Sequence, residues 1–141
     1  MLKTIAGALL LSLVSFGAFA ADEPAKVADS ASGKIWVDSK GMTLYTFEQD
    51  KKGEKASACT GDCIKEWPPL LAPDGAKPMD EWTLLDVVDA DGKTKQMWAY
   101  DGMPFYLFVD DKKPGDVTGQ DSGGFYVVGK DYQKIEGKTG S

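Results

Sequence analysis

Two cysteines carry the most definite chemistry in this chain. Cys59 and Cys63 stand four residues apart and are the only two. Export is predicted by the N-terminal segment described below, and such a pair in an exported protein most often forms a disulfide. In a regular helix, Cβ atoms at this spacing lie about 5 to 6 Å apart, whereas a disulfide needs about 3.8 Å. We therefore expect Cys59 to lie outside any helix, with residues 60–62 forming a turn. Thiol redox or metal chemistry is the alternative, although the Cys-x-x-Cys spacing is absent and no Arg or His lies nearby to lower a thiol pKa.

A motif of two aromatic residues and an aspartate occurs twice. It reads Tyr45-x-Phe47-x-x-Asp50 in the first copy and Tyr106-x-Phe108-x-x-Asp111 in the second. The two-residue spacing puts tyrosine and phenylalanine on one face of a strand, where both can be buried. The aspartate and the lysines after it suit an exit turn in which the carboxylate accepts backbone amides and Gly53 or Gly115 takes positive φ. This interpretation makes the motif framework. The alternative makes the two copies halves of one binding site, with both tyrosines and both aspartates converging across a pseudo-twofold axis.

The methionines raise the question of copper(I), which favours thioether ligands. The candidates are Met42, Met97 and Met103, and the first and last each follow the turn glycine of a repeat. Methionine is also a flexible core filler, so a packing role competes with copper. No other cofactor is predicted. Asp110 and Asp111 are adjacent and point to opposite faces of a strand, so they are poorly placed to share a proton, and no catalytic constellation emerges.

The charged residues exclude several classes of function. Sixteen basic residues, all lysine, face 22 acidic ones, and the net charge is -6. Nucleic-acid binding lacks both the basic balance and the arginine forks that read phosphate and guanine. Histidine is absent, which excludes histidine-dependent catalysis and histidine-ligated zinc, copper and haem. An acidic surface is compatible with docking a basic redox partner.

The apolar pattern predicts a mainly β protein, a compact single domain built from two tandem repeats that each contain a hairpin. In the second repeat Asp101-Gly102 joins two apolar runs, which indicates a type I′ turn with positive φ at both positions. One short helix is expected near the cysteine pair, over residues 60–67, capped by Thr60 or Asp62 and ended by the prolines that follow. The strand candidates are 34–38, 42–47, 82–88, 95–100, 103–109 and 123–129.

The ends of the chain differ from this domain in composition. Residues 1–20 have the basic start, apolar run and Ala-x-Ala end of a cleaved secretory signal. We expect a flexible lead-in over 21–33, the repeat domain over 34–130, and a flexible tail over 131–141. Repeat 1 spans about 34–70 and repeat 2 about 95–130. No transmembrane segment is predicted, and no cysteine near the cleavage site can accept a lipid. These features predict a soluble exported protein, periplasmic or secreted.

The motifs YTFEQD and YLFVDD, together with the segment CTGDCIKEWPP at 59–69, resemble those of a bacterial secreted-repeat family. Its members are often predicted lipoproteins and share a Tyr-x-(Phe/Trp/Tyr)-x-x-Asp motif. The resemblance covers about residues 33–128. It implies export and a tandem repeat, and it carries no established activity, substrate or cofactor. The missing lipidation cysteine departs from the lipoprotein pattern.

Two hypotheses for the function follow. The leading one is a non-enzymatic exported binding or interaction module for an unidentified exported protein or small ligand. The alternative is a periplasmic copper or redox accessory protein that uses the three methionines and the cysteine pair, with a basic redox partner.

Overall fold

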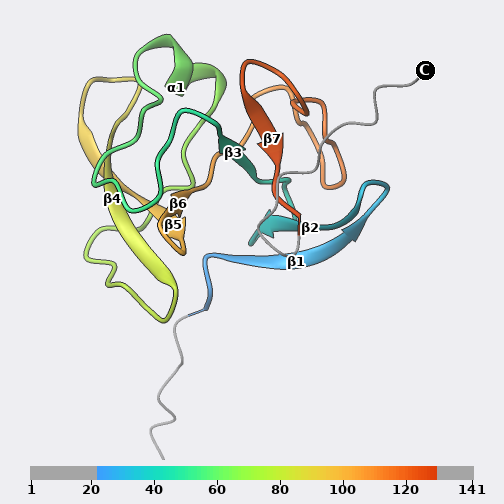
Figure 1. The fold of residues 1–141 in the computed structure, drawn as a ribbon, viewed down its shortest axis with the longest axis horizontal. Helices are drawn as coiled ribbons and strands as arrows, with labels where there is room; N and C mark the ends of the chain where they lie inside the picture. Colours follow the sequence, from blue (N-terminus) through green and yellow to red (C-terminus); the bar gives the residue numbers. More distant parts are fainter. Residues whose placement is uncertain (1–21, 130–141) are drawn as a thin grey trace, which may run out of the picture.

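The computed structural model describes residues 22–129, so the predictions for the signal at 1–20 and the tail at 131–141 lie outside the described residues. The described part is mainly β, as predicted, with one short helix (Figure 1). The elements are β1 (Ala25–Ser30), β2 (Gly33–Asp38), β3 (Tyr45–Phe47), α1 (Asp62–Glu66), β4 (Trp82–Val88), β5 (Thr94–Tyr100), β6 (Met103–Pro104) and β7 (Phe125–Val127).

The strands form three small antiparallel sheets. β1 pairs with β2, β3 pairs with β7, and β4, β5 and β6 pair in that order. Figure 1 shows the β4–β6 sheet on one side, the β1–β2 hairpin on the other, and β3 between them. No helix among the described residues is long and apolar enough to span a membrane.

The predicted flexible lead-in is wrong over residues 25–30, because β1 occupies them. β1 pairs with β2 along its whole length, from Ala25 opposite Asp38 to Ser30 opposite Gly33. The sequence of β1 does not predict a strand, because its side chains are mostly small or polar and only Ala25 is buried. The strand is formed by backbone pairing to its apolar neighbour, with little contribution from its own side chains.

The turn of the second hairpin is confirmed, whereas its second strand is shorter than predicted. Asp101 and Gly102 have φ of 45° and 81°, as the type I′ turn requires. β6 ends at Pro104. Phe105 N still donates to Trp98 O of β5 at 3.3 Å, and the next two amides donate to residues 45 and 68 instead. The first hairpin behaves alike, because residues 42–44 fold back along β2 and β3 then pairs with β7.

The two repeats exchange strands. β3 of the first repeat pairs with β7 of the second, with Tyr45 opposite Val127. In the second repeat Tyr106 lies opposite Pro69, which belongs to the first. The motif segment of each repeat therefore pairs with the last segment of the other, which is β7 in the second repeat and residues 68–70 in the first. Repetition therefore builds the fold, because two copies close one core that a single copy would leave open.

Matching hydrogen bonds give the exchange a pseudo-twofold axis. Trp36 N donates to Val128 O at 2.9 Å, and Trp98 N donates to Leu70 O at 2.8 Å. At the centre the two motif tyrosines pair with each other, with N···O distances of 2.8 and 2.9 Å. Each residue in these bonds thus has a counterpart in the other half, with Leu70 matching Val128.

The helix begins without the side-chain cap expected from Thr60 or Asp62. Its N-cap is Gly61, and no side chain bonds the first turn. The Asp62 carboxylate instead accepts Lys65 Nζ at 3.0 Å. The helix ends at Glu66, just before the proline pair, as the missing amides of proline predict.

Candidate functional site

The repeated tyrosines and aspartates come together in crossed pairs. Tyr45 Oη donates to Asp111 Oδ2 at 2.7 Å, and Tyr106 Oη donates to Asp50 Oδ2 at 2.6 Å. Each tyrosine therefore bonds the aspartate of the other repeat, and all four side chains are buried. The four residues do meet about the pseudo-twofold axis, and they meet as partners of one another.

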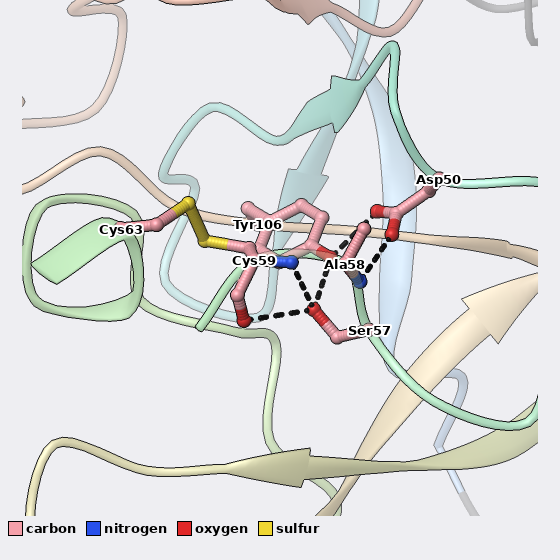
Figure 2. Close-up of a disulfide and its surroundings, with 6 residues drawn as sticks. All are labelled: Asp50, Ser57, Ala58, Cys59, Cys63 and Tyr106. Atoms are coloured by element: carbon pink, nitrogen blue, oxygen red, sulfur yellow. Dashed lines mark hydrogen bonds between the residues drawn. A yellow bond between two sulfur atoms is a disulfide. The ribbon is translucent and has the colours of Figure 1, made fainter. Parts of the chain in front are cut away.

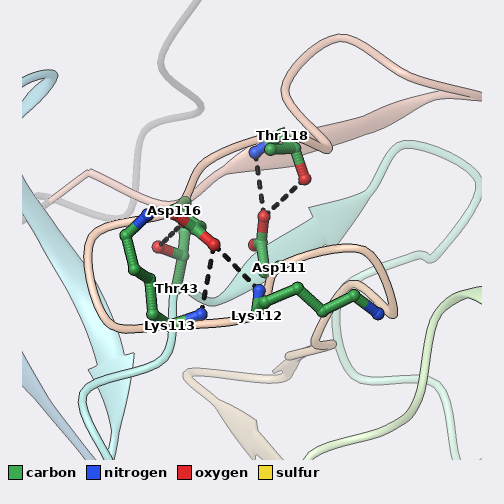
Figure 3. A network of polar contacts seen from close by, with 6 residues as sticks. All are labelled: Thr43, Asp111, Lys112, Lys113, Asp116 and Thr118. Carbon is green, nitrogen blue, oxygen red and sulfur yellow. Dashed lines mark hydrogen bonds and ion pairs between the residues drawn. The ribbon is translucent and has the colours of Figure 1, made fainter.

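The second oxygen of each aspartate holds the loop that follows it. Asp50 Oδ1 accepts the amide of Ala58 at 2.8 Å (Figure 2). Asp111 Oδ1 accepts the amide and the hydroxyl of Thr118, at 2.9 and 2.6 Å (Figure 3). These bonds are the exit turns predicted for the motif, and Gly53 and Gly115 have the positive φ expected of them, 81° and 93°.

Each tyrosine hydroxyl has a second partner from the loop that its aspartate holds. Ser57 Oγ lies 2.7 Å from Tyr106 Oη, and Gly119 N donates to Tyr45 Oη at 3.2 Å. Glycine is the residue type that fits at position 119, because a Cβ atom on Gly119 would lie 2.6 Å from the Trp67 ring. The two halves thus use similar geometry with different atoms.

The surroundings keep the tyrosines protonated. Burial raises the pKa of Tyr45 well above its usual range, and the hydrogen bond to Asp111 acts in the same direction. Burial likewise raises the pKa of Tyr106, with the Asp50 charge adding to it. The Asp50 pKa is also raised by burial, against hydrogen bonds from Tyr106 and Ala58 that lower it. The phenols are therefore fixed hydrogen-bond donors within the core.

Four aromatic rings stack beside these pairs. Neighbouring centroids are 4.3, 3.8 and 4.3 Å apart, and the closest contact is between Phe125 and Trp67, one from each repeat. The motif phenylalanines form the two ends of the stack, so the axis passes between the central rings. The order is Phe47, Phe125, Trp67 and Phe108.

The cysteine pair lies next to one crossed pair. Cys59 and Cys63 are joined in a disulfide with Cα atoms 5.3 Å apart, and Cys59 lies outside the helix (Figure 2). Cys63 N donates to Thr60 O at 3.2 Å, which closes the turn between them. Ser57, which bonds Tyr106, also accepts the Cys59 amide at 3.0 Å. The bridge therefore stiffens the loop that Asp50 holds.

The three candidate copper ligands lie in different surroundings. Met97 is fully buried in the core between the sheets. Met103 is half-buried and lines a small pocket of about 310 Å³ with Asp50 and Glu48, a pocket that Met42 and Met97 do not line. Met42 is half-buried near the turn after β2, where its amide donates to Asp38 Oδ1. Within residues 22–129, no three His, Cys, Asp or Glu side chains are grouped so that they could hold a metal ion. Copper binding through thioethers remains a prediction.

A groove of about 920 Å³ lies beside residues 69–79, in the segment that leads from α1 to β4. Its walls are mainly apolar and come from residues 69–79, β5 and the chain before β1. The repeated motifs do not predict this groove, although the proline-rich segment at 68–78, with its two leucines, indicates an apolar segment outside the strands. Leu71, 44 % exposed, lies on its wall. Other lining residues are Leu70, Met79, Trp98, Leu107 and Asp38.

A comparison with protein families identifies both halves. The model of a family described as a secreted repeat of unknown function matches residues 26–71 and 86–128. Each matched range contains one motif segment and one segment that pairs with the other repeat. Neither the curated proteins nor the solved structures include a match to the chain.

Proposed function

Because the chain belongs to this family of secreted repeats and is an exported protein, we propose that it is a non-enzymatic binding module. The periplasm or the cell exterior would be its place of action. Its ligand site would be the groove beside Leu71. One contrast carries the proposal. The repeated tyrosines and aspartates are buried and hydrogen-bond each other, whereas the groove is apolar and open.

The groove has the properties of a ligand site. Pockets for small molecules commonly measure about 300–1,000 Å³ and are lined by apolar side chains with few polar groups. A volume of about 920 Å³ falls in this range. An apolar wall that stays in contact with water in the absence of ligand favours the burial of an apolar ligand surface.

Native mass spectrometry of protein purified from a periplasmic extract tests the proposal. We expect an added mass on the unmodified protein that is lost on Leu71→Asp. Val88→Asp is the matched control, because Val88 is 42 % exposed and lies outside the groove. The proposal fails if the protein carries no added mass after incubation with the small-molecule fraction of the extract. It also fails if both variants lose the mass equally.

A further inference from the structure

The groove carries more negative than positive charge. Three carboxylates line it, those of Asp22, Glu23 and Asp38, against one ammonium group, that of Lys77. Asp22 and Glu23 are exposed and therefore screened by water and salt. Asp38 is 8 % exposed, which makes it the charge that a ligand would feel most strongly.

The Asp38 carboxylate is held in place with one oxygen uncommitted. Its Oδ1 accepts the amides of Lys40 and Met42, both at 2.9 Å, so the turn after β2 fixes the orientation of the group. Among the residues at 22–129, no hydrogen bond or ion pair reaches Oδ2. A largely buried carboxylate favours a partner that can donate to it or neutralise it. A cation entering the groove would supply that partner.

The apolar lining would accept the rest of such a ligand. Leu70, Leu71 and Met79 line the groove, and Trp98 lines it with an aromatic ring. The volume suits a small molecule better than a folded partner, which would need a broad interface of roughly 800 Å² per side. A fitting ligand therefore joins an apolar body to one positive group.

The pseudo-twofold axis shows that the fold itself does not require this groove. In the other half, Val128 takes the place of Leu70 and lines a pocket of only about 310 Å³. Thr46, one residue after the motif tyrosine, stands there in place of Leu107. The segment 71–79 that builds the larger wall has no counterpart lining the smaller pocket. The groove is thus an addition to a framework that the two halves share.

We propose that the groove binds small amphipathic cations, with a protonated amine at Asp38 and an apolar body along Leu70 and Leu71. This inference rests on the proposed function, since it names the ligand class of the same site. The partner chemistry is an alkyl or aryl amine that carries its positive charge at neutral pH.

Three probes with the same chain length test it: octylammonium, octanol and octanoate, titrated at pH 7 and followed by amide shifts in NMR spectra. Octylammonium should bind roughly tenfold more tightly than octanoate, as expected for one modest charge contact. Asp38→Asn should weaken octylammonium by about the same factor and leave octanol unchanged. The asparagine oxygen can still accept both amides, so the turn is retained.

Two further variants sharpen the result. Lys77→Gln should strengthen octylammonium, because it removes the competing charge from the groove. Asp86→Asn removes an exposed carboxylate outside the groove and should change nothing. Equal affinity for the three probes would overturn the charge inference and leave the groove as an apolar binding site. If none of the probes shifts the groove amides, the proposed function fails as well.

Discussion

Tyr45→Phe removes the hydroxyl that joins the two repeats at one crossed pair. The lost bond is a charge-assisted one of 2.7 Å to a buried carboxylate, and such bonds contribute about 1.5 to 3 kcal/mol. Asp111 keeps both bonds from Thr118, so its carboxylate is left only partly unsatisfied. We expect the free energy of unfolding to fall by about 2 kcal/mol.

A double-mutant cycle shows whether the pairing is crossed. Tyr45→Phe combined with Asp111→Asn should give a coupling energy of about 1.5 kcal/mol or more, because the residues share one hydrogen bond. Tyr45→Phe combined with Asp50→Asn should be additive within about 0.5 kcal/mol, because this aspartate bonds Tyr106 instead. The two coupling energies compare Asp111, from the other repeat, with Asp50, from the same motif as Tyr45.

Urea unfolding followed by tryptophan fluorescence and circular dichroism supplies the free energies. With an m-value of about 1 to 2 kcal/mol/M, a loss of 2 kcal/mol moves the midpoint by roughly 1 to 2 M. Equal m-values for the variants are needed, since a changed slope would mean a changed unfolded or native state. A coupling within one motif that equals or exceeds the coupling across motifs would refute the strand exchange.

Three further predictions concern the same framework. Above pH 10 the free energy of unfolding should fall as pH rises, because the raised pKa values of Tyr45 and Tyr106 keep both phenols protonated in the folded protein, whereas tyrosine in the unfolded chain ionises and binds fewer protons. Absorbance at 295 nm should show two phenols that ionise only with unfolding, and tyrosine-to-phenylalanine variants should remove that step. Replacing Cys59 and Cys63 by serine should cost about 2 kcal/mol in urea unfolding, the entropy of closing so short a loop, and a loss near zero would show that the loop is ordered without the bridge. Gly119→Ala would place its methyl group 2.6 Å from a carbon of the neighbouring indole, so thermal unfolding should show a loss of about 1 to 3 kcal/mol; an unchanged midpoint would mean that the ring stack yields at little cost.

The sequence determined the features that depend on neighbouring residues. Asp101-Gly102 turns the second hairpin because only a few residue types accept positive φ twice in succession. Pro68 ends the helix because it lacks an amide hydrogen. Asp50 and Asp111 bond amides a few residues ahead, as their turn composition indicates. Such features follow from local sterics and short-range hydrogen bonds, which a sequence displays directly.

The tertiary structure decided which tyrosine of the repeated motif bonds which aspartate. The two repeats present the same tyrosine and the same aspartate, so the sequence is equally consistent with pairing inside a copy and between copies. Only the path of the chain brings β7 beside β3 and carries Tyr45 to Asp111. β1 pairs locally with β2, but its mostly exposed side chains lack the apolar alternation that marks a strand in a sequence. The groove arises in the same way, from segments far apart along the chain whose apolar residues, taken singly, look like core.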